Sequence, residues 1–200
     1  MKVKQVSQAY KKLLENELFR KQAVVWLGFF GVIVVLKFFL RGFFLIFNLS
    51  LVLLLLGGAF GMMVSWVDRL IWVYYTRPKD SLSVKVKGLI KDKKVWEAFE
   101  TLKSRGHEQD KLAMSNVLFL AVWCVLSFFV MSSSPSWFGK GVIMGIGLSL
   151  VYGIWEDWDD QEKLMGRLFW PIKRRVKQNE MQIVLAVFLG FFAMGAFLAI

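Results

Sequence analysis

Apolar runs long enough to cross a lipid bilayer are the feature that most constrains this chain. Residues 23–75 are almost entirely apolar, which is too long for one membrane helix of roughly 20 residues and suits two. Three more apolar runs follow at about 112–132, 137–155 and 181–200. Because 56% of all residues are hydrophobic, a soluble domain of this size would expose adhesive surface. The sequence therefore predicts five transmembrane helices.

The polar segments between these runs complete an all-α fold, a polytopic membrane helix bundle with additional amphipathic interfacial helices. The first two spans are expected near 23–40 and 50–73, and a longer first helix that turns at Asn48 is the alternative. The expected parts are a cytoplasmic amphipathic helix at 1–22, a transmembrane hairpin at 23–75, a cytoplasmic helical connection at 76–111, a second transmembrane hairpin at 112–155, a cytoplasmic acidic and basic segment at 156–180, and a C-terminal transmembrane helix at 181–200.

Basic residues are sorted strongly between the two sides of the predicted membrane. The segments 1–22, 76–111 and 156–180 contain 22 of the 26 Lys and Arg residues. Cytoplasmic loops are rich in Lys and Arg, so the N-terminus is expected in the cytoplasm and the C-terminus outside. We expect a multi-pass protein of the plasma (inner) membrane in contact with anionic lipids. Binding of nucleic acid is not expected, because the basic residues are spread over short loops against the membrane.

A basic cluster directly before the last span is the expected lipid head-group contact. Such clusters are attracted to an anionic leaflet by about 1 kcal/mol per basic residue. The cluster consists of Lys173, Arg174, Arg175 and Lys177.

The sequence contains no recognisable catalytic motif, and no catalytic residue or cofactor is predicted. The single histidine, His107, cannot supply a multi-histidine metal site, and the single cysteine, Cys124, lies inside an apolar run. No glycine-rich phosphate loop or nucleophile triad is present either.

An acidic cluster follows the fourth span and allows two interpretations. Carboxylates this dense could bind Mg²⁺ or Ca²⁺, which prefer oxygen ligands. The favoured interpretation is structural, because acidic residues at the start of a helix interact well with its dipole and can pair with neighbouring basic loops. The residues are Glu156, Asp157, Asp159 and Asp160.

Four polar residues lie within or beside the first two spans. They are Lys37, Asn48, Asp68 and Arg69. Ionisable groups in a membrane are costly and are often functional. Near the end of a span the cost is smaller, because long side chains reach water. Anchoring at the interface is therefore favoured over a role in transport or gating.

Three spans carry small residues four positions apart, which let helix backbones approach closely. The pairs are Gly57 with Gly61, Gly141 with Gly145, and Ala186 with Gly190. They favour close packing within a bundle or in a homo-oligomer, and the spacing does not separate the two.

These patterns favour an assembly, scaffold or accessory subunit of a membrane complex, without enzymatic activity. The amphipathic helix expected at 92–105 would contact a protein partner or the bilayer through Val95, Trp96, Phe99 and Leu102. A small oligomeric transporter or channel is the first alternative. A metal-dependent lipid-modifying enzyme, built on the acidic cluster, is the second.

Overall fold

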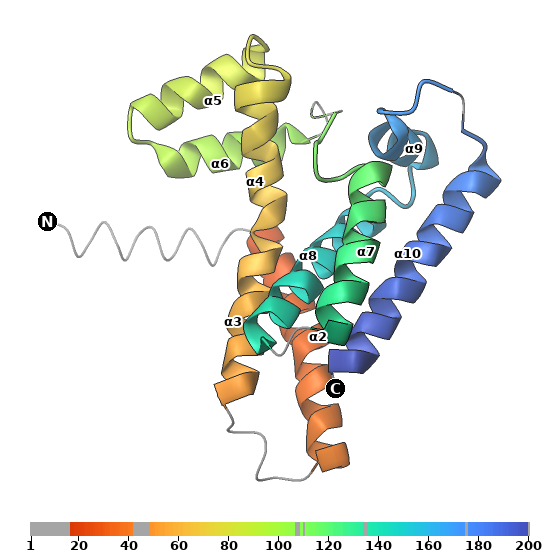
Figure 1. Cartoon of the computed structure of the whole chain (residues 1–200). Coiled ribbons are helices and arrows are strands. Elements are labelled where there is room, and N and C mark those ends of the chain that lie inside the picture. Colours follow the sequence, from red (N-terminus) through yellow and green to blue (C-terminus); the bar gives the residue numbers. More distant parts are fainter. Residues whose placement is uncertain are drawn as a thin grey trace, which may run out of the picture.

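The computed structural model describes residues 17–41, 49–106, 109, 111–133, 136–174 and 176–199, and all regular secondary structure in these residues is helical. The predicted all-α fold is therefore confirmed for this part of the chain. The helices are α2 (Glu17–Arg41), α3 (Leu49–Met62), α4 (Val64–Ile71), the π-helix η2 (Trp72–Thr76), α5 (Ser81–Lys91), α6 (Val95–Ser104), α7 (Val117–Ser133), α8 (Trp137–Glu156), α9 (Gln161–Phe169) and α10 (Gln178–Ala199) (Figure 1).

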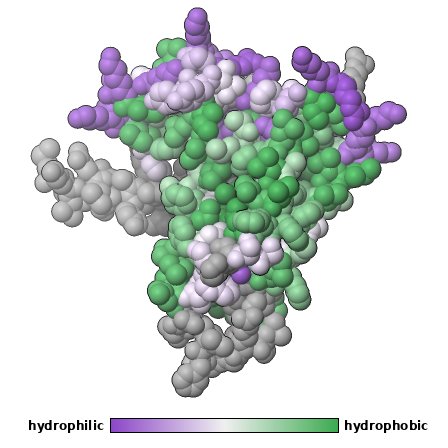
Figure 2. Space-filling model, viewed as in Figure 1, coloured by the Kyte–Doolittle hydropathy of each residue, from purple (hydrophilic) through white to green (hydrophobic). Residues whose placement is uncertain are grey.

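Three of these helical stretches are long and apolar enough to cross a membrane. They are Leu49–Thr76, Trp137–Glu156 and Gln178–Leu198. Two further apolar helical stretches, Lys21–Leu36 and Val117–Ser133, are shorter. On the face drawn in Figure 2, apolar side chains form a belt over these helices, and hydrophilic side chains gather at the end that carries α5, α6 and α9. We call this end the polar end. The chain thus has the build of a helical membrane protein.

The third apolar run begins its helix later than expected. Residues 111–116 are not helical, and α7 starts only at Val117. The amide oxygen of Asn116 accepts a hydrogen bond from the Phe119 amide at 3.1 Å, which caps the first turn of α7. We call residues 111–116 the strap, because they lie across the polar end before the chain enters α7.

Among the described helices, α3 and α8 make the most extensive contact, where they cross. A Cβ atom placed on Gly57 would lie 2.2 Å from the Phe138 carbonyl oxygen, and one on Gly61 would lie 2.2 Å from that of Val142. From the other side, a Cβ on Gly145 would lie 2.1 Å from the Gly58 carbonyl oxygen. No residue larger than glycine fits these positions without moving a backbone.

The remaining long helices pack around α8. The Trp123 indole of α7 donates a hydrogen bond to the Ile143 carbonyl of α8 at 3.0 Å and makes an edge-to-face contact with Phe188 of α10. Phe30 of α2 is buried against Gly58 of α3, and its neighbour Phe29 contacts Phe192 of α10 at 5.3 Å between ring centres. The hydrogen bond of the Trp123 indole supports this packing, because lipid hydrocarbon would offer its N–H group no acceptor.

A helical hairpin, α5 and α6, stands on the end of the α3–α4–η2 helix (Figure 1). It has a small core of its own, which is buried between η2, α5, α6 and the strap: Trp72, Val73, Leu82, Val86, Ala98, Leu102 and Leu112. Asp80 caps α5 by accepting a hydrogen bond from the Leu82 amide at 3.0 Å. The hairpin is therefore held firmly on the helix that carries it.

Candidate functional site at the polar end

Asp68 is almost fully buried near the polar end, with 1% of its surface exposed. One carboxylate oxygen accepts hydrogen bonds from the Ala113 and Met114 amides at 2.8 and 2.9 Å. The other accepts from the Ser115 hydroxyl at 3.0 Å. Bonds to a charged acceptor are stronger than neutral ones and offset the cost of burying the carboxylate. Asp68 therefore fastens the strap to α4.

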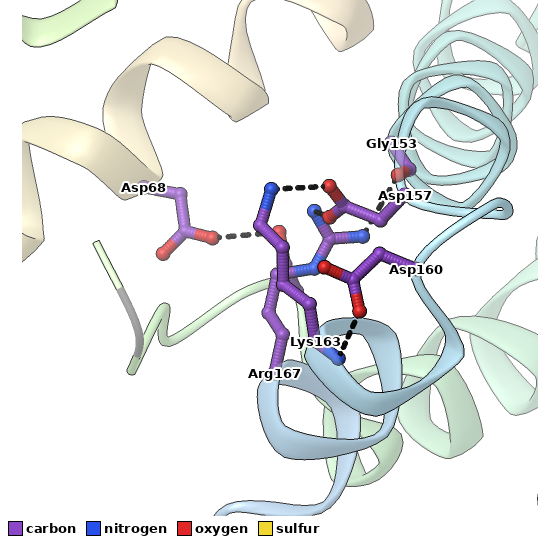
Figure 3. Close-up of polar contacts among 7 residues, drawn as sticks. Asp68, Gly153, Asp157, Asp160, Lys163 and Arg167 are labelled. Atoms are coloured by element: carbon purple, nitrogen blue, oxygen red, sulfur yellow. Dashed lines mark hydrogen bonds and ion pairs between the residues drawn. The ribbon is translucent and has the colours of Figure 1, made fainter. Parts of the chain in front are cut away.

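A second buried carboxylate, Asp157, lies between α8 and α9 with 5% of its surface exposed. It forms ion pairs with Lys163, at 2.7 Å, and with Arg167. Arg167 also donates a hydrogen bond to the Gly153 carbonyl at 2.8 Å. Figure 3 shows the guanidinium of Arg167, from α9, beside the Asp157 carboxylate and the Gly153 carbonyl. We call Asp68, Ser115, Asp157, Lys163 and Arg167 the polar junction.

Arg167 is the central cation of the polar junction. Burial lowers the pKa of its guanidinium from the ordinary value, and Asp157, Glu156 and Asp68 raise it again. The arginine side chain is protonated in proteins at all ordinary pH values, so Arg167 carries its charge here. A permanently charged group with fixed bonds to α8 and α9 is suited to holding the two helices together.

A small cavity borders the polar junction. It has a volume of about 20 Å³ and is lined by Asp68, Ser115, Ser149 and Arg167 among others. A cavity of this size holds one water molecule, for which roughly 10–15 Å³ of such space is enough. It is too small for an organic substrate. The junction has the geometry of a structural connection between α4, the strap, α8 and α9.

The acidic residues after α8 have separate roles in the structure. Asp157 belongs to the polar junction, and Asp160 caps α9 by accepting a hydrogen bond from the Lys163 amide at 3.0 Å. Glu156 and Asp159 are exposed. Within the described part of the chain, no three His, Cys, Asp or Glu side chains converge as metal ligands would.

Of the four polar residues of the first two spans, the structure describes the side chains of Asp68 and Arg69, and these two have different neighbours. Asp68 bonds the strap, whereas the guanidinium of Arg69 lies 5.3 Å from the ring centre of Trp66. The Nη1 atom of Arg69 is buried and has no hydrogen-bond partner among the described residues. Lys37 belongs to α2, and Asn48 lies outside the described residues.

The basic cluster before α10 is exposed where the structure describes it. Lys173 and Lys177 are open to the surroundings, and Arg174 pairs with Glu180 at 3.0 Å. Glu180 also accepts a hydrogen bond from the Lys177 amide at 3.1 Å, which satisfies a backbone N–H group directly before α10. Arg175 lies outside the described residues.

The small-residue pairs divide into two groups. Gly57, Gly61, Gly141 and Gly145 all lie in the α3–α8 crossing. On α10, a Cβ at Gly190 would meet nothing within 4 Å, and Ala186 is exposed. The first two pairs thus pack within the chain, and the third faces outward.

Sequence reasoning missed Arg167, Ser115 and Trp170. The Trp170 indole donates a hydrogen bond to the Leu112 carbonyl at 3.0 Å and joins the end of α9 to the strap. The only local signal for Arg167 is its place next to Leu168 and three residues after Leu164, which puts it at the edge of the buried face of α9. No spacing rule connects it with Asp157.

Comparison of the chain with models of protein families, with curated proteins and with solved structures found no match. The class of protein is therefore defined by the fold itself. In the residues that the structure describes, it is an all-helical protein with three helical stretches apolar and long enough to cross a membrane and a packed helical hairpin at the polar end of one of them.

Proposed function

We propose that this chain is a non-enzymatic assembly or scaffold subunit of a membrane complex, which binds a partner protein through its α5–α6 hairpin. In this proposal the protein has five spans in the plasma (inner) membrane, with the polar end in the cytoplasm. The observation that carries it is a hairpin with its own buried core, presented on an extended membrane helix.

The length of that helix supports the proposal. The stretch Leu49–Thr76 has 28 residues, which corresponds to about 42 Å at the usual helical rise. The hydrocarbon core of a bilayer is about 30 Å thick. The polar end of the helix therefore extends beyond the hydrocarbon and holds α5 and α6 at the membrane surface.

The surface of the hairpin has the composition of a protein contact. Tyr75 is 82% exposed at the base of the hairpin, and Val84 and Val95 are exposed on α5 and α6. The lysines at positions 85, 91, 93 and 94 of the hairpin are exposed as well. Protein interfaces combine aromatic and apolar anchors with a charged rim. A partner with an acidic rim would suit this surface.

Two of the four side chains expected from the sequence to meet the partner, Phe99 and Leu102, pack inside the molecule instead. Leu102 is part of the hairpin core, and Phe99 makes an edge-to-face contact with Trp66 of α4 at 5.4 Å. These two residues attach α6 to the rest of the molecule. The proposed contact surface is therefore Tyr75, Val84 and Val95 with the neighbouring lysines.

Site-specific photocrosslinking in the native membrane tests the proposal. A photoreactive phenylalanine analogue would replace Tyr75 or Val84 in the full chain, with Val125 as the control. Val125 is exposed on α7, in the apolar belt. We expect one discrete protein adduct at both hairpin positions and none at Val125. Adducts with lipid alone, or with a second copy of the chain alone, would contradict the proposal.

The charged rim can be tested in the same assay. The double substitution Lys91→Glu and Lys93→Glu should lower the adduct yield at Tyr75 severalfold, because rim charges mainly govern the rate of encounter. Lys173→Glu is the matched control, since Lys173 is also exposed at the polar end but lies outside the hairpin. An equal loss in both variants would show that only the general positive charge matters.

A further inference from the structure

Exposed aromatic side chains are sorted by type along the described helices. The exposed tryptophans and tyrosines of the described residues all lie at or near the polar end: Tyr74, Tyr75, Trp155, Trp158 and Trp170. The exposed phenylalanines lie in the middle of the apolar helices or toward their other end: Phe60, Phe128, Phe129, Phe138 and Phe197. Tryptophan and tyrosine carry a polar group on an apolar ring and collect where a membrane meets water. The sorting therefore points to a membrane boundary at the polar end.

The turn between α8 and α9 presents two of these tryptophans. Trp155 is 77% exposed in the last turn of α8, and Trp158 is 50% exposed. The Trp158 amide donates a hydrogen bond to the Trp155 carbonyl at 3.1 Å, so both side chains leave the same turn of backbone. Between them, Asp157 is buried in its ion pairs with Lys163 and Arg167. The polar junction thus holds the two exposed indoles at a fixed level.

The length of α8 places this level at the edge of the hydrocarbon. Trp137 begins α8, and the Lys140 ammonium lies 5.1 Å from the centre of its ring. Trp155 follows Trp137 by 18 residues, which corresponds to about 27 Å at the usual helical rise. The hydrocarbon core is about 30 Å thick, and membrane helices are rich in tryptophan at both of its boundaries. Each of these two tryptophans therefore suits one boundary of the same bilayer.

The charges beside the indoles narrow the surroundings of the turn further. Glu156 and Asp159 are exposed next to Trp155 and Trp158. Carboxylates are costly in hydrocarbon, whereas burying the apolar surface of the indole rings is favourable. The headgroup layer satisfies both, because it offers water to the carboxylates and acyl chains to the rings.

We propose that the α8–α9 turn is a lipid-interface anchor, in which Trp155 and Trp158 insert into the headgroup layer at the polar end. Their rings lie against the upper part of the acyl chains, and their N–H groups donate hydrogen bonds to lipid ester oxygens. The inference rests on the membrane placement in the proposed function. It goes beyond that function because it makes the ion pairs of Asp157 the support of a lipid contact.

The anchor leaves the base of the hairpin in water. Asp68 borders the same small cavity as Gly153 and Ile154, so these residues lie at one level. Tyr75 follows Asp68 by seven residues along the same helix, which corresponds to about 10 Å. Tyr75 therefore lies beyond the level of Trp155 and is free to meet a protein partner.

Depth-dependent fluorescence quenching of the full chain in phosphatidylcholine vesicles tests the anchor. In a Cys124→Ala background, an environment-sensitive fluorophore would be attached to one of four variants: Trp155→Cys, Trp158→Cys, Tyr75→Cys or Val125→Cys. The labels at positions 155 and 158 should be quenched at least twofold more by lipid spin-labelled near its ester groups than by lipid spin-labelled deep in the chain. They should exceed by the same factor the quenching by iodide present on both sides of the membrane. The label at 125 should respond mainly to the deep quencher, and the label at 75 mainly to iodide.

The control positions separate failure of the anchor from failure of the membrane placement. If the label at 125 responds to the deep quencher while those at 155 and 158 respond to iodide, the anchor is wrong and the membrane placement stands. Weak quenching of 155 and 158 by all three quenchers would show that protein covers the turn, which also overturns the proposal. If the label at 125 responds mainly to iodide, the membrane placement fails and the anchor fails with it.

Tryptophan emission provides a second measurement without labels or cysteine variants. Lipid brominated near its ester groups should quench the emission of the wild-type chain. The double substitution Trp155→Phe and Trp158→Phe should remove at least half of this quenching. Trp72→Phe is the control, because Trp72 is buried in the hairpin core and should not contribute. Equal quenching of the double variant and the wild type would overturn the proposal.

Discussion

Single atoms decide how closely the helices approach. At the α3–α8 crossing, the hydrogen atom of glycine stands where a methyl group would overlap a backbone carbonyl, so α3 and α8 touch through their backbones. Lipid tails are as apolar as leucine, and helices in a membrane gain stability mainly from such packing. Gly190 of α10 lies outside the crossing and has no such role, because nothing lies within 4 Å of a Cβ placed there.

Gly145→Ala should therefore destabilise the protein, by about 1–3 kcal/mol if it resembles other overpacked cores. The new methyl group would meet the Gly58 backbone, which cannot rotate away. Gly190→Ala is the control and should be neutral or slightly stabilising, because alanine favours a helix and nothing lies within 4 Å. Thermal unfolding in detergent measures both. Equal midpoints would mean that the crossing is looser than described.

The stability of the polar end also depends on single side chains, namely those that pair with the buried carboxylate of Asp157. Arg167→Met removes the more buried of the two cations on Asp157 and leaves only the pair with Lys163. Breaking a fully buried pair costs about 3–5 kcal/mol, and the expected loss is smaller here because Lys163 still compensates part of the charge. Lys163→Met should cost less, since Lys163 is largely exposed and exposed pairs contribute about 0.2–1 kcal/mol. Adding Asp157→Asn to Arg167→Met should restore part of the stability. Unfolding midpoints of the four proteins provide the test, and equal losses in the two Met variants would contradict it.

At the scale of elements, the molecule consists of apolar helices and short connections fastened by polar side chains. The strap is the clearest case, because it is bonded to α4 through Asp68 and to the end of α9 through Trp170. The hairpin is fastened instead by apolar contact, through its own core and through the Phe99–Trp66 pair. Each connection therefore has its own source of stability and can loosen separately from the spans.

Leu102→Ala should open the hairpin locally. Truncating a buried leucine costs about 2–5 kcal/mol, and Leu102 is buried in the small core between α5, α6 and η2. We expect faster trypsin cleavage at the lysines of α5 and faster amide exchange in α5 and α6, with α7 and α10 unchanged. Val84→Ala is the control on the exposed side of α5. Faster exchange in α7 and α10 would show that the hairpin does not open as a separate unit.

For the whole molecule, the separation of polar from apolar surface determines the surroundings in which it is stable. The hydrophilic side chains gather at one end, and the apolar belt lies along the helices (Figure 2). Such a surface is stable only if the belt is covered by lipid and the polar end reaches water. In the proposed orientation, the polar end faces the cytoplasm, as the concentration of lysine and arginine there requires.

Cysteine labelling tests this orientation on the full chain. Cys124 is buried, and replacing it with alanine provides a background without thiols. In that background, a membrane-impermeant maleimide should label Ser133→Cys in intact cells and Lys91→Cys only after permeabilisation. Both positions are exposed, at opposite ends of the helices. The reverse pattern would place the polar end outside.

What the sequence determines by itself is the helical character of the chain, its apolar stretches and its polar end. These follow from hydropathy and charge, which add up residue by residue along each segment and need no knowledge of neighbours. The start of α7 was less predictable, because an asparagine cap and the bonds of the strap to Asp68 override the apolar pattern from residue 112 onward.

Only the tertiary structure decides which residues meet. The spacing of Gly57 with Gly61 and of Gly141 with Gly145 marks two small faces, and their mutual contact depends on how α3 and α8 are rotated and crossed. The same holds for Asp68 with the strap, 45–47 residues further along the chain, and for Phe99 and Leu102, which pack inside the molecule rather than outside. Rotation and crossing are set jointly by all side chains in an interface, so no local pattern contains them.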